Sequence, residues 1–453
     1  MQVTSILFLF LFLPCFLACY YLAPRSARKG IMVLGSLLFY YLASCNPAGQ
    51  TLFDLGAVWR LLLLLVLTWL TYVAGLTLSH PGREKFLAVY LAVLGGILVF
   101  FKCFANGRYL PGGMSFYLFQ MSAYLIDVYR RRLTPERNLM SYSAQILMFP
   151  KMLSGPIVNP RDLKDQSHSP NYNLKNIHRG IQEVVLGLFL KVMIANRLGG
   201  LWGQAGVIGY ESISTPFAWL ALIAYAMRLY FDFYGYSLMA VGLGRMLGFD
   251  LPMNFLDPYC SKSVSEFYRR WHATLGAWFR EYLYIPLGGN RHGTAMTIFN
   301  LAVVWLFTGL WHGVGGNYLL WAFFLFVMIV IERLWLRKYL ERSKVWCHVY
   351  LVFVILLSWL PFAIGDFEQL KIYFLKLFGL GGNVVHSTDY ITWGKQYLWL
   401  LLTGVLFATP LPGKIWENIR RRPFADLLIF ILFWVIVYFI STSAQDPFMY
   451  FQY

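Results

Sequence analysis

The stretch VWRLLLLLVLTWLTYVAGLTL (Val58–Leu78) contains a single charged residue, Arg60, and decides the fold class. About 17–25 consecutive apolar residues in an α-helix span the hydrocarbon core of a bilayer. Similar runs recur near Thr4–Leu22, Phe86–Phe104, Ile181–Leu198, Phe217–Leu238, Met296–Leu310, Tyr318–Ile331, Val349–Ile364, Tyr397–Thr409 and Leu427–Ile440. With the shorter runs Ile31–Ala43 and Met114–Val128, they predict an all-α polytopic membrane protein with about eleven or twelve crossings.

The composition supports the same class. Of the 453 residues, 58% are hydrophobic, 19% are aromatic and only 13% are charged. Soluble domains average about 45–50% apolar and about 25% charged residues, whereas aromatic rings are enriched at the headgroup level of membranes. The composition excludes a disordered chain, a fibrous repeat and a secreted disulfide scaffold. The six cysteines are scattered and form no CxxC pair, so neither a zinc site nor a disulfide framework is predicted.

The net charge is +17, from 38 Lys and Arg residues against 21 Asp and Glu residues. The basic residues lie in short clusters between the apolar runs, as in the cytoplasmic loops of membrane proteins. We therefore expect them to orient loops and to contact anionic lipid, and we expect no nucleic-acid partner. Arg25, Arg28 and Lys29 follow the first run, which favours an uncleaved span with its N-terminus outside the cytoplasm.

Two stretches resemble neither a continuous membrane-spanning helix nor a polar loop. Residues 141–158 are interrupted by two prolines and a glycine. Residues 263–289 combine many aromatic residues with arginines, and helical spacing places Phe267, Trp271 and Trp278 on one face. Broken backbone and charge at membrane depth need protein or water around them. We predict re-entrant or interfacial segments within one membrane domain spanning residues 1–453; an amphipathic surface helix is the alternative for the second stretch.

His312 is the candidate catalytic residue by its position, and His272 is a second histidine in an unusual segment. His312 lies between two apolar runs in TGLWHGVGGNY, where glycines permit close backbone approach. Imidazole titrates near neutral pH and can take a proton from a hydroxyl; a structural histidine bonded to a neighbouring helix is the alternative. His272 shares a segment with Arg269 and Arg280. These arginines could bind the phosphates of a donor molecule, or they could be ordinary cytoplasmic loop charges.

Other chemistry has no signature in the chain. The sequence contains no Walker A, HExxH, GxSxG or GxGxxG motif, and its acidic residues do not form a two-carboxylate metal set. We therefore predict no metal site and no tightly bound cofactor. A non-enzymatic transporter is the alternative from a different class. Transporters usually show internal symmetry or paired broken helices, but the two broken segments here do not resemble each other.

These motifs, in their order along the chain, resemble the membrane-bound O-acyltransferase (MBOAT) family. Within that family the chain is similar to the bacterial branch containing the integral-membrane subunit of alginate O-acetyltransferase. The resemblance runs almost end to end, and its strongest part is SEFYRRWHATLGAWFREYLYIPLGGNR (Ser265–Arg291) followed by GLWHG (Gly309–Gly313). The other matching motifs are ILFLFLFLPCFLACYYLAP (Ile6–Pro24), MSFYLFQMSAYLIDVYR (Met114–Arg130), FPKMLSGPI (Phe149–Ile157), LYFDFYGYSLMAVGLGRMLGF (Leu229–Phe249), MNFLDPY (Met253–Tyr259) and PFMYFQY (Pro447–Tyr453).

The resemblance implies helices around a central tunnel and transfer of an acyl group from a cytoplasmic thioester donor to a hydroxyl. His312 matches the defining histidine of the family, and His272 matches its second characteristic position, which is Asn or His. His312 would act as general base on the acceptor hydroxyl, and His272 would orient or polarise the acyl carbonyl. The accompanying candidates for binding donor or substrate are Trp271, Arg269, Arg280 and Trp311.

The branch implies acetyl transfer to an extracytoplasmic polysaccharide in the bacterial cytoplasmic (inner) membrane, with an extracytoplasmic acetyltransferase as partner. The donor would be acetyl-CoA or a carrier-protein thioester, and D-alanyl transfer to teichoic acid is the alternative within the family. The chain has Tyr234 and Leu238 where the family pattern has Ser and Asp, and Lys151 where relatives often have His or Gln. These departures leave the acceptor open.

Overall fold

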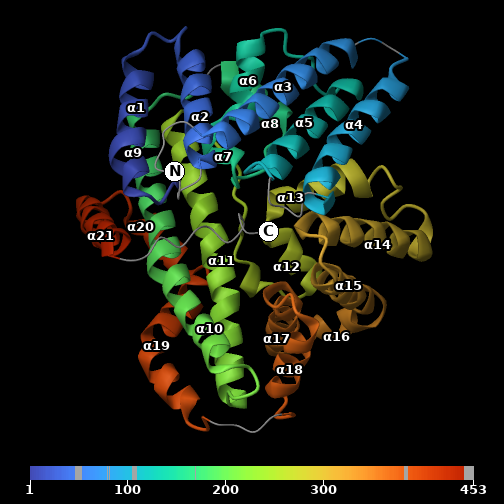
Figure 1. The fold of residues 1–453 in the computed structure, drawn as a ribbon, viewed down its shortest axis with the longest axis vertical. Helices are drawn as coiled ribbons and strands as arrows, with labels where there is room; N and C mark the ends of the chain where they lie inside the picture. The colour runs from blue at the N-terminus through green and yellow to red at the C-terminus, as the bar shows by residue number, and fades with distance from the viewer. Residues whose placement is uncertain are drawn as a thin grey trace. The chain divides into compact units, whose positions relative to one another are not determined.

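A computed structural model describes residues 1–45, 54–78, 80, 82–104, 110–168, 170–381 and 386–442 (Figure 1). The prediction of an all-α protein is confirmed. Over these ranges the regular structure is helical, with one isolated antiparallel bridge between Phe255 and Trp271 and no strand. The closing PFMYFQY motif, residues 447–453, lies outside the described residues.

The chain groups into two compact units, each assembled from separated segments; the single membrane domain expected from the sequence stays a prediction. The first unit contains Met1–Leu188, Tyr236–Met253 and Trp434–Gln452. Its helices include two π-helices, Phe8–Phe12 and Phe100–Phe104, and α1 (Leu13–Leu22), α2 (Arg28–Ser44), α3 (Leu55–Leu78), α4 (Glu84–Val99), α5 (Met114–Tyr129), α6 (Leu139–Leu147), α7 (Phe149–Met152), α8 (Pro160–His168) and α9 (Leu174–Leu188). Within it, α2 packs on α3 and α6, and α3 packs on α5.

The second unit contains Phe189–Gly235 and Asn254–Phe433. Two helices continue across the division: α11 (Thr215–Met246) and α21 (Pro423–Thr442). The other α-helices are α10 (Asn196–Ile208), α12 (Val264–Arg270), α13 (Ala273–Phe279), α14 (Gly293–His312), α15 (Gly316–Ile331), α16 (Arg337–Leu340), α17 (Lys344–Ala363), α18 (Phe367–Leu377), α19 (Asp389–Phe407) and α20 (Leu411–Ile419). A 3-10 helix at Pro258–Cys260 and π-helices at Phe189–Ala195, Arg280–Tyr284 and Glu332–Leu336 complete it.

Seven helical segments of the described chain are long and apolar enough to cross a membrane. They are Leu55–Leu78, Glu84–Cys103, Leu174–Ile208, Gly293–His312, Gly316–Leu340, Lys344–Ala363 and Pro423–Thr442. The pair α19 and α20, bent by 74°, would be an eighth crossing. Seven or eight candidate crossings are fewer than the eleven or twelve predicted from apolar runs. Three of the predicted crossings, Phe8–Leu22, α2 and α5, form helices shorter than 18 residues.

The two interrupted stretches are broken helices. Every residue from Ser141 to Val158 is buried, so the short helices α6 and α7 are enclosed by protein, as broken backbone at membrane depth requires. In the second stretch, residues 263–289, the structure differs from the continuous helix that the spacing of the aromatic residues predicts. Helix α12 ends at Arg270 and α13 begins at Ala273, so Trp271 and His272 occupy a break between two short helices.

Four helices of the second unit position the candidate site. Helices α14 and α15 pack against each other and are joined by a short glycine-rich connection. Helix α15 also packs on α17, and α12 packs on both α15 and α17 (Figure 1). The end of α14 and the break after α12 are thereby held by the same neighbours.

Candidate active site

His312 is the last residue of α14, and glycines let the chain turn tightly around it. A Cβ atom at Gly313 would lie 2.5 Å from the ring of Tyr318, and one at Gly309 would lie 2.9 Å from Ala322. Both positions require glycine because residues at the start of α15 fill the space. His312 itself is buried, with 7% of its surface exposed.

Three aromatic rings enclose the imidazole of His312, and we call Trp311, Trp321 and Phe362 the aromatic box. Their ring centroids lie 4.5, 4.9 and 5.1 Å from that of His312. All three are buried, and they belong to α14, α15 and α17 respectively. Such surroundings strengthen hydrogen bonds to a bound group and exclude water from it.

His272 lies in the break between α12 and α13 with φ of +47° and ψ of +50°. This left-handed conformation is uncommon for a residue with a Cβ atom. A hydrogen bond from the Ala273 N–H to the Asn254 carbonyl, at 2.9 Å, holds the backbone there. The ring of Phe233 stands against the buried imidazole at 4.7 Å and 89°. Backbone strain of this kind clusters at functional sites.

Burial keeps the His272 ring neutral, and Asn254 selects which ring nitrogen carries the proton. Burial lowers the pKa of His272 to about 3, so the imidazole is neutral at neutral pH. Its Nδ1 lies 3.3 Å from Asn254 Oδ1, which also accepts a hydrogen bond from the Thr274 hydroxyl at 2.6 Å. With Nδ1–H donating to this oxygen, Nε2 carries the lone pair. His272 in this state can accept a proton or a hydrogen bond at Nε2.

Trp311 connects the two histidines. Its ring centroid lies 4.5 Å from that of His312 and 6.1 Å from that of His272. Trp271, beside His272 in the chain, packs on Trp359 of α17 at 5.1 Å. The structure therefore brings four of the six predicted residues into one buried aromatic cluster.

The other two predicted residues, Arg269 and Arg280, lie apart from this cluster. Both side chains are exposed, and neither forms an ion pair within the described part of the chain. By contrast, their neighbour Arg270 pairs with Glu266 at 2.6 Å. Binding of donor phosphates by Arg269 and Arg280 stays a prediction.

A buried carboxylate that the sequence reasoning missed anchors the His272 segment. Glu332, in the π-helix after α15, accepts hydrogen bonds from the backbone N–H of Val264 at 2.5 Å and of Ser265 at 3.2 Å. It also accepts a hydrogen bond from the Ser265 hydroxyl at 3.2 Å. These groups open α12, whose first backbone donors have no partner inside the helix. The sequence signal for this role is an acidic residue at the end of an apolar run, because a buried carboxylate requires hydrogen-bond or charge partners.

Three lysines are buried in the described structure: Lys151 in the first unit, and Lys191 and Lys376 in the second. In the second unit, Lys191 of the π-helix Phe189–Ala195 pairs with Asp232 of α11, and their side chains are 3% and 1% exposed. In the first unit, Lys151 of α7 donates to the side-chain oxygen of Gln120 on α5. Burial lowers the pKa of Lys151 to about 7.

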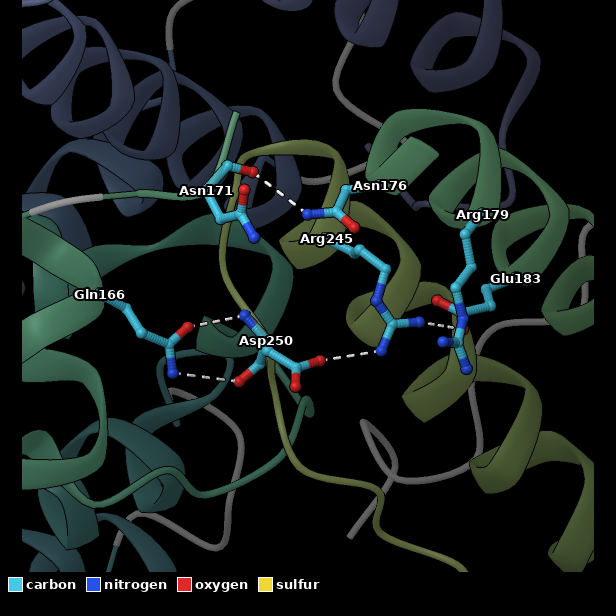
Figure 2. A network of polar contacts seen from close by, with 7 residues as sticks. All are labelled: Gln166, Asn171, Asn176, Arg179, Glu183, Arg245 and Asp250. Atoms are coloured by element: carbon cyan, nitrogen blue, oxygen red, sulfur yellow. Dashed lines mark hydrogen bonds and ion pairs between the residues drawn. The ribbon is translucent and has the colours of Figure 1, made fainter. Parts of the chain in front are cut away.

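A polar network ties the ends of α8, α9 and α11 together in the first unit, and Figure 2 shows its members. Arg245, near the end of α11, contacts the carboxylates of Glu183 and, at 2.8 Å, Asp250. Glu183 also pairs with Arg179 at 3.1 Å, and Gln166 accepts from the Asp250 backbone N–H at 2.7 Å. Arg245 thereby links α9 to the segment that follows α11.

Comparison with known proteins identifies the family. Residues 49–366 match the sequence profile described as MBOAT, membrane-bound O-acyltransferase family. The chain is 32% identical to the probable alginate O-acetylase AlgI of Pseudomonas putida, in an alignment of 495 positions covering 100% of both chains. It is 29% identical to the peptidoglycan O-acetyltransferase of Helicobacter pylori, over 83% of this chain and 79% of that protein. It is 28% identical to the teichoic acid D-alanyltransferase of Streptococcus thermophilus, over 56% and 65% respectively.

The match to the family covers the interrupted stretch at residues 141–158, both histidines and the aromatic box. Membership also decides against a non-enzymatic transporter, the alternative that the sequence left open. The chain belongs to the membrane-bound O-acyltransferase family and is a multi-pass membrane acyltransferase.

Proposed function

We propose that this acyltransferase moves an acetyl group from a cytoplasmic thioester donor, through a tunnel in the protein, to hydroxyls of an extracytoplasmic polysaccharide. The polysaccharide would be reached directly or through an extracytoplasmic acetyltransferase partner, in a bacterial cytoplasmic (inner) membrane. Two of the relatives are named for O-acetylation of alginate and of peptidoglycan. The D-alanyltransferase relative aligns with a smaller share of this chain, which favours acetyl over D-alanyl transfer.

The observation that carries the proposal is the position of His312 inside the aromatic box, linked through Trp311 to His272. The imidazole of His312 takes the proton of the acceptor hydroxyl as the hydroxyl oxygen attacks the carbonyl carbon of the thioester. The C–S bond then breaks, and the departing thiolate receives that proton from the imidazolium. The surrounding rings keep water away and so limit wasteful hydrolysis of the thioester.

His272 would orient the reacting groups. Its Nδ1–H donates to Asn254, so its Nε2 can accept a hydrogen bond from the acceptor hydroxyl or from the thiol released after transfer. Polarising the acyl carbonyl would instead require a proton on Nε2. The neutral ring and the Asn254 contact therefore favour the orienting role over the polarising role.

The donor would be acetyl-CoA or an acetylated carrier protein. Exposed Arg269 and Arg280, on the segment that carries His272, are available to bind phosphate groups of such a donor. No tightly bound cofactor is needed for this reaction, because the thioester itself supplies the activated acyl group.

The test compares wild-type protein, His312→Ala and the exposed-residue control His292→Ala in membranes that retain native partners. Radiolabelled acetyl-CoA and an acetylated carrier protein are supplied in parallel, with polysaccharide as acceptor. We expect loss of a general base to lower transfer by about 10²–10⁴-fold, and we expect the control to retain activity. Wild-type transfer rates in a folded His312→Ala protein would overturn the proposal. Labelling from a D-alanyl donor but not from either acetyl donor would favour the D-alanyl alternative.

A further inference from the structure

A buried hydrogen-bond donor stands beside His312 without a partner. Trp321 of α15 is 2% exposed, and its ring centroid lies 4.9 Å from that of His312 at an interplanar angle of 86°. Its indole Nε1–H makes no hydrogen bond to any residue that the structure describes. Buried polar groups are hydrogen-bonded in the great majority of cases, and a catalytic role is one of the reasons for which a buried donor stays without a protein partner.

The surroundings of Trp321 are aromatic. Its ring lies 5.3 Å from Phe362, 5.9 Å from Trp305 and 6.3 Å from Trp359. These rings hold the indole in place from α14 and α17, and their carbon faces offer only weak acceptors to an N–H group. An oxygen atom brought into the aromatic box by a substrate would be a far better acceptor.

We propose that the Nε1–H of Trp321 is the hydrogen-bond donor to the acyl oxygen, in the thioester carbonyl and in the oxyanion that forms from it. This inference rests on the proposed function. When the hydroxyl oxygen attacks, the carbonyl π electrons move to the acyl oxygen, and the hydroxyl proton moves to His312. The oxyanion then re-forms the carbonyl, the C–O ester bond is kept, and the thiolate leaves with the proton from His312.

The chemistry of the indole selects the acyl oxygen over the attacking hydroxyl. An indole N–H can donate but cannot accept, so it must bind a lone pair. The hydroxyl oxygen needs its lone pair for attack, and a donor on it would weaken the nucleophile. The acyl oxygen gains negative charge in the transition state, and a fixed donor in a dry site stabilises that charge.

Trp321→Phe is the direct test, because phenylalanine keeps an aromatic ring and removes the N–H. The control is Trp202→Phe, the same change at an indole of α10 that packs on Tyr225 and Tyr373. In the acetyl-transfer assay described above, we expect Trp321→Phe to lower kcat by about 10²-fold or more, as loss of one oxyanion donor does. We expect KM for the donor to stay within about threefold, and we expect Trp202→Phe to stay near wild type.

Replacement of Trp321 by 3-benzothienylalanine keeps the indole shape and exchanges the N–H for sulfur, so it provides the measurement if Trp321→Phe does not fold. A kcat near wild type in the folded benzothienyl protein, with His312→Ala inactive, would overturn the role of Trp321 and leave the proposed function standing. A raised KM with unchanged kcat would also overturn it, because the contact would then be to the ground state only. Absence of acetyl transfer in the wild-type protein would overturn the proposed function itself.

Discussion

The rings of Trp311 and His272 lie 6.1 Å apart, centre to centre, although the two residues belong to different helical segments. Trp311 directly precedes His312 at the end of α14, whereas His272 lies in the break between α12 and α13. One indole therefore contacts both imidazoles. Because Trp311 is buried and rigid, it sets the spacing between the two candidate catalytic residues.

The left-handed backbone at His272 leads to a prediction about two variants. Asn tolerates positive φ and can still hydrogen-bond to Asn254, whereas Ala loses the hydrogen bond and does not favour this conformation. We expect His272→Ala to be about 1–2 kcal/mol less stable than His272→Asn. Thermal unfolding of both proteins in one detergent measures the difference. Equal stability would show that neither the strain nor the Asn254 contact matters.

The sequence leads directly to both histidines because each has a local signal. His312 is an ionisable residue among apolar runs and glycines, and His272 follows an aromatic and arginine-rich stretch. The close approach expected at Gly309 and Gly313 is confirmed by the rings and helices that fill the space beside them. Adjacency in the chain predicts the contact of Trp311 with His312. The contact of Trp311 with His272 depends on how α14 packs, so the sequence does not predict it.

The break at Trp271 and His272 could not be predicted from spacing. Phe267 and Trp271 fit one helical face, so the pattern indicates a continuous helix. The break is stabilised by Asn254, which binds the backbone of Ala273 and the side chain of His272 from a distant part of the chain. Apolar runs likewise show where helices can form but not where they end, so three of the predicted crossings correspond to helices shorter than 18 residues.

Glu332 provides a prediction about the segment that carries His272. Replacing it with Gln removes the charge and leaves one oxygen to serve the backbone donors of Val264 and Ser265. We expect Glu332→Gln to lower the free energy of unfolding by about 1–3 kcal/mol. The control is Glu341→Gln, which breaks an exposed pair with Arg337 and is expected to leave stability near that of the wild type. Similar losses from both variants would contradict the anchoring role.

The buried pair of Lys191 and Asp232 provides a prediction about stability inside the second unit. Lys191→Met removes the ammonium that pairs with the Asp232 carboxylate in a low-dielectric site, so we expect a loss of about 3–5 kcal/mol. Removing both charges in Lys191→Met/Asp232→Leu avoids that penalty and is expected to recover most of the loss. A double-mutant cycle measured by thermal unfolding gives the coupling. Additive losses in the cycle would show that the pair does not interact.

The pH dependence of stability tests the environment of Lys151. Its pKa is lowered from 10.5 to about 7 by burial, so between these values the unfolded chain binds a proton at Lys151 that the folded chain does not. Stability then rises with pH across this window, by up to about 1.4 kcal/mol per pH unit. Below about pH 7 both states are protonated, and the folded protein carries the full cost of the buried charge.

Lys151→Gln removes this titration and keeps a polar side chain beside Gln120. We expect the variant to exceed the wild type in stability by a constant margin below about pH 7, and the margin to shrink steadily as the pH rises toward 10. Unfolding midpoints of both proteins from pH 6 to pH 10 give that margin directly, because the other titrating groups are common to both. A margin independent of pH would mean that Lys151 keeps an ordinary pKa in the folded protein and is reached by water.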